Sequence, residues 1–150
     1  MSDEAATHEG YMRRCLELAR QARAEGNTPV GSVVVLGGQI VGEGVEQLPR
    51  GNDPTGHAEV LACQAAAARL GSSRLEGAVL YSTAEPCLMC SYVIRKSGIA
   101  SVVYGTAVPH VGGVTSTLPV LTTPSLDAWR PAPRVLGGVL AEECRKLGAE

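Results

Sequence analysis

Four residues in two short segments could form a metal-dependent hydrolytic site. His57 and Glu59 lie in the first segment, and Cys87 and Cys90 form a Cys-x-x-Cys pair in the second. One imidazole and two thiolates suit Zn²⁺, and three protein ligands leave a fourth tetrahedral position for water, which is typical of a catalytic site. Zinc lowers the pKa of its bound water from about 15.7 to about 7. We expect Glu59 to be the catalytic residue that carries protons between this water, the substrate and the leaving group.

The Cys-x-x-Cys pair has other interpretations. By itself it would be more typical of a redox pair or of half a structural zinc site. A structural site with four ligands would need another Cys-x-x-Cys pair or a second histidine at ligand spacing, and the other cysteines, at positions 15, 63 and 144, are isolated. The pattern therefore favours a catalytic zinc ion. A zinc-stabilised scaffold without activity is the alternative, and the presence of Glu59 argues against it.

Helix signals place both ligand segments at helix ends. Asp53-Pro54 predicts a helix start, with a capping side chain before a proline, and Gly71 predicts the end of that helix. Glu85-Pro86 predicts the start of a second helix that runs to about Lys96. The ligands would then lie in early turns, where the positive end of a helix favours thiolate over thiol.

Hydrophobic periodicity predicts an α/β chain around these helices. Strands are expected over residues 30–36, 39–45, 77–82, 100–105 and 134–136. Two further helices are expected over residues 9–25 and 138–147. A strand, a helix and a strand in succession around the cysteines imply a right-handed parallel crossover, and ligands bind at the carboxyl ends of such strands. Residues 1–8 are expected to form a disordered tail, and residues 9–150 a single domain.

The two ligand segments resemble a known family. Asn-Asp-Pro-Thr-Gly-His-Ala-Glu-Val at 52–60 and Glu-Pro-Cys-Leu-Met-Cys at 85–90 are similar to the motifs of the cytidine and deoxycytidylate deaminase superfamily. With 29–35 and 139–144, they look like its guanine deaminase and tRNA adenosine deaminase branch. The resemblance covers about residues 8–147. It implies a three-layer α/β/α fold with a mixed sheet of about five strands, one zinc ion per subunit, release of ammonia, and a homodimer.

The resemblance also suggests substrate contacts. Glu46 stands where the family commonly has an asparagine, and as a carboxylate it would accept from an N–H-rich edge or a cation, unless it faces solvent. The backbone N–H of Ala58 and the carbonyl of Glu85 flank the matched motifs and are carried over as contacts. His110 stands near the place of an acidic residue of guanine deaminases, and could instead be a surface loop residue. Trp129 could cap the site, or could be a core or interface residue.

Composition favours a small substrate. The formal net charge is −2 and aromatic residues make up 3% of the chain, which argues against a broad nucleic-acid footprint with many stacking platforms. We therefore expect a free amino-heterocycle, that is, a nucleobase, a nucleoside or a related metabolite such as guanine or cytosine, and consider a nucleic-acid partner unlikely. Deamination of adenosine to inosine in tRNA is the alternative.

The sequence also bears on location. The first ten residues are polar and acidic without an apolar leader, and no later run approaches the length of a membrane span. We expect a cytoplasmic protein without a membrane partner.

Overall fold

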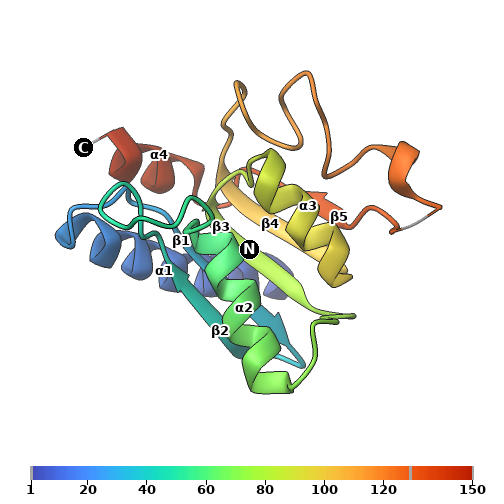
Figure 1. Cartoon of the computed structure of the whole chain (residues 1–150). Helices are drawn as coiled ribbons and strands as arrows, with labels where there is room; N and C mark the ends of the chain where they lie inside the picture. The colour runs from blue at the N-terminus through green and yellow to red at the C-terminus, as the bar shows by residue number, and fades with distance from the viewer. Residues whose placement is uncertain (1, 129, 150) are drawn as a thin grey trace.

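The strands form one mixed sheet. The structure is a computed structural model that describes residues 2–128 and 130–149. The strand order is β2-β1-β3-β4-β5, with antiparallel pairing of β1 to β2 and to β3, and parallel pairing from β3 to β5 (Figure 1). The strands are β1 (Gly31–Leu36), β2 (Gln39–Val45), β3 (Val79–Ala84), β4 (Ser101–Thr106) and β5 (Arg134–Leu136).

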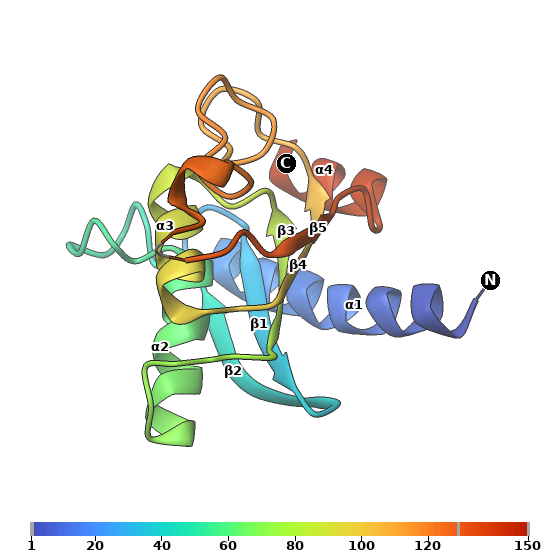
Figure 2. The same ribbon diagram turned by 90° about the vertical axis from the view of Figure 1, so that its right-hand side faces the viewer.

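Helices cover both faces of the sheet. On one face lie α2 (Ala58–Leu70) and α3 (Leu88–Ser97), and on the other lie α1 (Asp3–Ala24) and α4 (Ala141–Ala149), as the side-on view in Figure 2 shows. A short 3₁₀ helix, Pro124–Leu126, interrupts the long connection from β4 to β5. The predicted three-layer α/β/α fold with five strands is therefore confirmed. Within the described residues, no helix is long and apolar enough to cross a membrane.

Side chains that alternate along the strands form two hydrophobic cores, one on each face of the sheet. Successive side chains of a strand point to opposite faces, so neighbouring apolar residues serve different layers. Val34 and Leu80 pack under α2 and α3, whereas Val33 and Tyr81 pack under α1 and α4. This explains why the central strands contain runs of consecutive apolar residues, such as 33–36 in β1 and 102–104 in β4.

Two glycines of β2 let α2 lie close to the sheet. A Cβ atom added at Gly44 would lie 1.9 Å from the carbonyl oxygen of Ala58, and one added at Gly42 would lie 2.4 Å from the carbonyl oxygen of Ala62. Any larger residue would push the backbone of α2 outward. The glycines therefore set the position of the helix that begins beside His57.

The predicted disordered tail is the first part of α1. The helix begins at Asp3, and the hydroxyl of Ser2 accepts a hydrogen bond of 3.1 Å from the N–H of Ala5 as its cap. Nδ1 of His8, which we expected in the tail, lies 2.8 Å from the hydroxyl of Tyr81 in β3. The cap and this contact with the sheet explain why residues 3–8 are helical.

The helix predicted from Asp53-Pro54 begins later. α2 starts at Ala58 with His57 at its N-cap. The carboxylate of Asp53 instead accepts bonds of 2.8 Å and 2.6 Å from the backbone N–H and the hydroxyl of Thr55, which forms a turn. The prediction failed because the same aspartate can cap a turn or a helix.

Candidate active site

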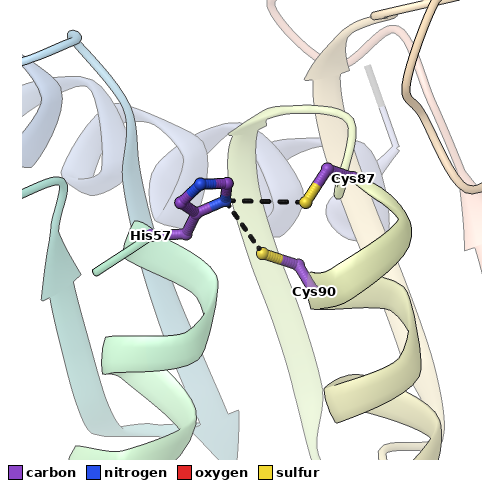
Figure 3. Close-up of side chains that lie close together, drawn as sticks. All are labelled: His57, Cys87 and Cys90. Carbon is purple, nitrogen blue, oxygen red and sulfur yellow. Dashed lines mark hydrogen bonds between the residues drawn. The ribbon is translucent and has the colours of Figure 1, made fainter. Parts of the chain in front are cut away.

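Three ligand side chains meet where α2 and α3 begin (Figure 3). His57 is the N-cap residue of α2, Cys87 is that of α3, and Cys90 lies in the first turn of α3. Nδ1 of His57 lies 3.5 Å from Sγ of Cys87 and 3.4 Å from Sγ of Cys90. Tetrahedral zinc with bonds of about 2.0 Å to nitrogen and about 2.3 Å to sulfur requires a separation of about 3.5 Å. The three atoms thus have the spacing of zinc ligands.

The chemistry of the two thiols also fits zinc. A hydrogen bond from the thiol of Cys90 lowers the pKa of Cys87 to about 5; burial opposes this effect, and the backbone N–H groups of Cys90 and Met89 support it. The same hydrogen bond and burial raise the pKa of Cys90. The pair therefore holds one proton between two sulfurs, and a metal ion that displaces this proton gains two thiolate ligands.

Glu59 lies beside the ligands and is buried. Burial, with a contribution from the negative charge of Glu46, raises the pKa of Glu59 to about 8. A zinc cation in the adjacent site would favour the charged carboxylate and act against this rise. A carboxyl group whose charged and neutral forms are both accessible near neutral pH is suited to accept a proton and to donate it again.

A cavity of about 510 Å³ opens over these residues. It lies where β3 and β4 end, in agreement with the expectation that ligands bind at the carboxyl ends of parallel strands. The polar side chains at its floor are His57, Glu59, Glu46, Glu85 and Cys87. Its walls come from residues 28–30 and 48–49, from α4, and from Thr106, Val108 and Val111 in the segment after β4.

Glu46 is buried in this cavity and does not face solvent. Its side chain is 6% exposed, and its Oε1 accepts a hydrogen bond of 2.8 Å from the N–H of Ala58. Burial raises the pKa of Glu46, and the N–H of Ala58 and the neighbouring His57 act in the opposite direction. The N–H of Ala58, which we had carried over as a substrate contact, is thus already engaged within the protein. Contact of Glu46 itself with substrate stays a prediction.

The remaining predicted contacts lie in different surroundings. His110 is exposed and does not line the cavity, which matches the alternative of a surface loop residue. Trp129 lies outside the described residues. Glu85 lines the cavity, and its carboxylate accepts hydrogen bonds from the loop after β4. Burial acts to raise the pKa of Glu85, but the hydrogen bonds from Thr115, Val108 and Val114 outweigh it and hold the pKa below its usual value.

The role of the Glu85 side chain was not predicted from the sequence. Only the carbonyl of Glu85 was predicted as a contact, although an acidic residue at the end of an apolar strand was a signal for a buried, hydrogen-bonded carboxylate. In the loop after β4, residues 106–117, the sequence pointed to His110, whereas Val108 and Val111 line the cavity. Their apolar character in a long loop was the available signal.

Comparison with known proteins decides the family. The model of the cytidine and deoxycytidylate deaminase zinc-binding region matches residues 5–106. The chain belongs to this family. It is 38% identical over 119 residues to the tRNA-specific adenosine deaminase of Aquifex aeolicus, which is 79% of either chain. It is therefore a zinc-dependent deaminase, as the ligand pattern predicted.

Solved structures of related deaminases have the same fold. A structure from a study of A-to-I editing by tRNA:A34 deaminases superposes with a TM-score of 0.85 and 33% identity, over 92% of this chain and 98% of the other. Guanine deaminase from Bacillus subtilis superposes with a TM-score of 0.64 and 30% identity, over 87% of this chain and 72% of the other.

Two predictions from the sequence are contradicted by these comparisons. We expected a small free heterocycle as substrate and no nucleic-acid partner, whereas the relatives of high identity over most of the chain are named for tRNA. The physical reason is that net charge is a sum over the whole chain. It does not show where the cations lie relative to the cavity.

Proposed function

We propose that this protein is a tRNA adenosine deaminase, which converts an adenosine of a tRNA to inosine. The observation that carries the proposal is the grouping of three zinc ligands beside Glu59, with His57, Cys87 and Glu59 lining an open cavity. It occurs in a chain with relatives 34–38% identical that are named tRNA-specific adenosine deaminase. The structure studied for editing at the wobble position of tRNA supports the same substrate.

The residues have distinct parts in this reaction. Zinc held by His57, Cys87 and Cys90 would activate a water molecule as the nucleophile. Glu59 takes the proton of that water, passes it to a ring nitrogen of the base, and then helps the amino group to leave as ammonia. The target base enters the cavity from a single-stranded loop, since a base in a duplex is not accessible.

Cations beside the cavity support an RNA substrate. Arg50 is exposed and directly follows Leu48 and Pro49, which line the cavity. Arg145 and Lys146 are exposed on α4, in the same turn as the cavity-lining residues Cys144 and Gly148, and Arg145 also pairs with Glu142. Phosphate groups are bound mainly by such side chains, and a loop that inserts one base needs only a few of these contacts. A small local group of cations is compatible with a net charge of −2.

The test compares RNA with free bases. Zinc-loaded protein is incubated with an anticodon stem-loop that carries adenosine at the wobble position, with the DNA form of the stem-loop, and with free adenine, adenosine, guanine and cytosine. Inosine is measured after nuclease digestion, and ammonia is measured for the free compounds. Glu59→Gln is the matched control, because it keeps the shape of the side chain and removes its ability to accept a proton.

We expect inosine from the RNA stem-loop and about 10²-fold to 10⁴-fold less from Glu59→Gln at unchanged zinc content. Added salt should raise KM for the RNA steeply, because phosphate contacts are lost to counterions. A higher kcat/KM for any free base than for the stem-loop would refute the proposal. Equal activity of wild type and Glu59→Gln would refute the assigned proton transfer.

A further inference from the structure

The carboxylate of Glu85 collects four hydrogen bonds from one loop. Its Oε1 accepts from the N–H of Val108 at 2.8 Å and from the hydroxyl of Thr115 at 2.6 Å. Its Oε2 accepts from the N–H of Val114 at 2.8 Å and from the N–H of Thr115 at 2.7 Å. Glu85 is 2% exposed. Both oxygens are thus used within the protein, and bonds of this charged kind are among the stronger ones.

The loop is joined to the cysteine segment at further points. The N–H of Leu88 donates to the carbonyl of Val111 at 3.1 Å, and the N–H of Gly113 donates to the carbonyl of Pro86 at 2.8 Å. A Cβ atom at Gly112 would lie 2.0 Å from Oε2 of Glu85, so only glycine allows the loop to come this close. The loop therefore lies against the carboxylate with its backbone.

The same loop forms one wall of the cavity. Val108 and Val111 line it together with Glu85 and Cys87, and Val111 is 40% exposed. Residues 107–117 contain no named helix or strand. Their backbone N–H groups thus have no regular ladder, and a buried carboxylate supplies acceptors in its place. The position of this wall of the cavity therefore depends on the side chain of Glu85, which lies in the cysteine segment and not in the loop.

We propose that Glu85 is a positioning residue that clamps the loop 106–117 in the shape that receives the target nucleoside. It acts on catalysis through Val108 and Val111 and makes no contact with the reacting atoms. The inference rests on the proposed function, because the nucleoside of a tRNA is taken to occupy the cavity. A wall that is held before binding lowers the entropic cost of placing the base, so its loss should weaken binding of the RNA most strongly.

The test replaces the carboxylate by an amide of the same shape. In Glu85→Gln one acceptor oxygen becomes an NH₂ group, which faces backbone N–H donors and cannot accept from them. We expect amide hydrogen exchange at Val108, Val114 and Thr115 to become at least about tenfold faster. KM for the stem-loop should rise by at least about tenfold, with a smaller change in kcat and unchanged zinc content.

Two further variants act as controls. Thr115→Val removes one of the four bonds and keeps the backbone donors, so it should shift exchange and KM in the same direction by less. It also tests the clamp if Glu85→Gln does not fold. Glu17→Gln changes an exposed glutamate of α1 in the same way, and should leave exchange in the loop, KM and kcat as in the wild type.

Each outcome bears on the proposal. Unchanged exchange in the loop, loss of zinc, or a fall in kcat without a rise in KM would each overturn it, since Glu85 would then be idle, part of the metal site or catalytic. Hydrogen exchange and zinc content need no substrate. If wild-type protein leaves the stem-loop unmodified, the proposed function fails, while these two measurements still decide whether Glu85 clamps the loop.

Discussion

Replacement of Gly44 by alanine should disturb the active site through the backbone of α2. The added Cβ would lie 1.9 Å from the carbonyl oxygen of Ala58 and 2.7 Å from the N atom of Ala62, and real Cβ contacts are essentially never shorter than 3.0 Å. The first turn of α2 must therefore move outward by about 1 Å or more, because both obstacles are backbone atoms. This movement carries His57 and Glu59 with it.

The expected magnitude follows from that displacement. Overpacking of this kind typically costs about 1–3 kcal/mol of unfolding free energy. A misplacement of catalytic groups by about 1 Å can cost about 10²-fold in rate. We therefore expect Gly44→Ala to lower the urea midpoint of the zinc-loaded protein and to reduce kcat/KM on the anticodon stem-loop by about 10²-fold.

The control is the same substitution at a glycine that has free space around it. An alanine at Gly10, in α1, meets no atom within 4 Å, and should leave activity unchanged and raise stability by about 0.5–1 kcal/mol, since alanine is the better helix former. Both variants are measured by urea unfolding, zinc content and inosine formation. If Gly44→Ala unfolds at the wild-type urea concentration and keeps full activity, the close approach of α2 to β2 is not what positions His57 and Glu59.

Two further predictions concern the floor of the cavity. Glu46→Gln retains an acceptor for the N–H of Ala58, so its free energy of unfolding in urea should lie within about 0.5 kcal/mol of the wild-type value. Glu46→Ala leaves that N–H unpaired and should lower the free energy of unfolding by about 1–3 kcal/mol. A wild-type kcat/KM for Glu46→Gln would show that Glu46 is not a substrate contact. Zinc affinity, measured by competition with a chelator, should fall about tenfold per pH unit on acidification from pH about 7.5, because the metal must displace the proton held by Cys90, whose pKa is raised. The fall should steepen towards pH 5, where Cys87, with a pKa of about 5, begins to be protonated as well; an affinity that does not change with pH would contradict this ligand set.

The sequence by itself determined the chemistry and most of the architecture. The positions of His57, Glu59, Cys87 and Cys90 identify a zinc-dependent deaminase because ligand spacing is a local property of the chain. Alternation and periodicity predicted the strands that the structure contains, with bounds that differ by one or two residues at most. The end of α2 was also predicted correctly, since Gly71 is its C-cap residue and has the left-handed conformation.

Only the tertiary structure decided what depends on residues far apart in the chain. Residues 3–8 are helical where His8 meets Tyr81 in β3. Glu46 is buried because α2 brings the N–H of Ala58 to it. Neither contact has a signal in the local pattern, since the partners are brought together by packing of the sheet layers.

The placement of the cations belongs to this second group. Net charge and aromatic content predicted a small free heterocycle, but these totals do not show where the charged residues lie. The cations of α4 come near the cavity only because the helix packs against the sheet and lines the cavity with Cys144 and Gly148. Glu85 is a single residue whose role could not be predicted from its neighbours in the sequence. Its sequence neighbours assign it to a metal motif, whereas its four hydrogen bonds come from a loop that is 23 to 30 residues away along the chain. Short-range spacing therefore determined the reaction, and long-range contacts determined the shape of the site in which it takes place.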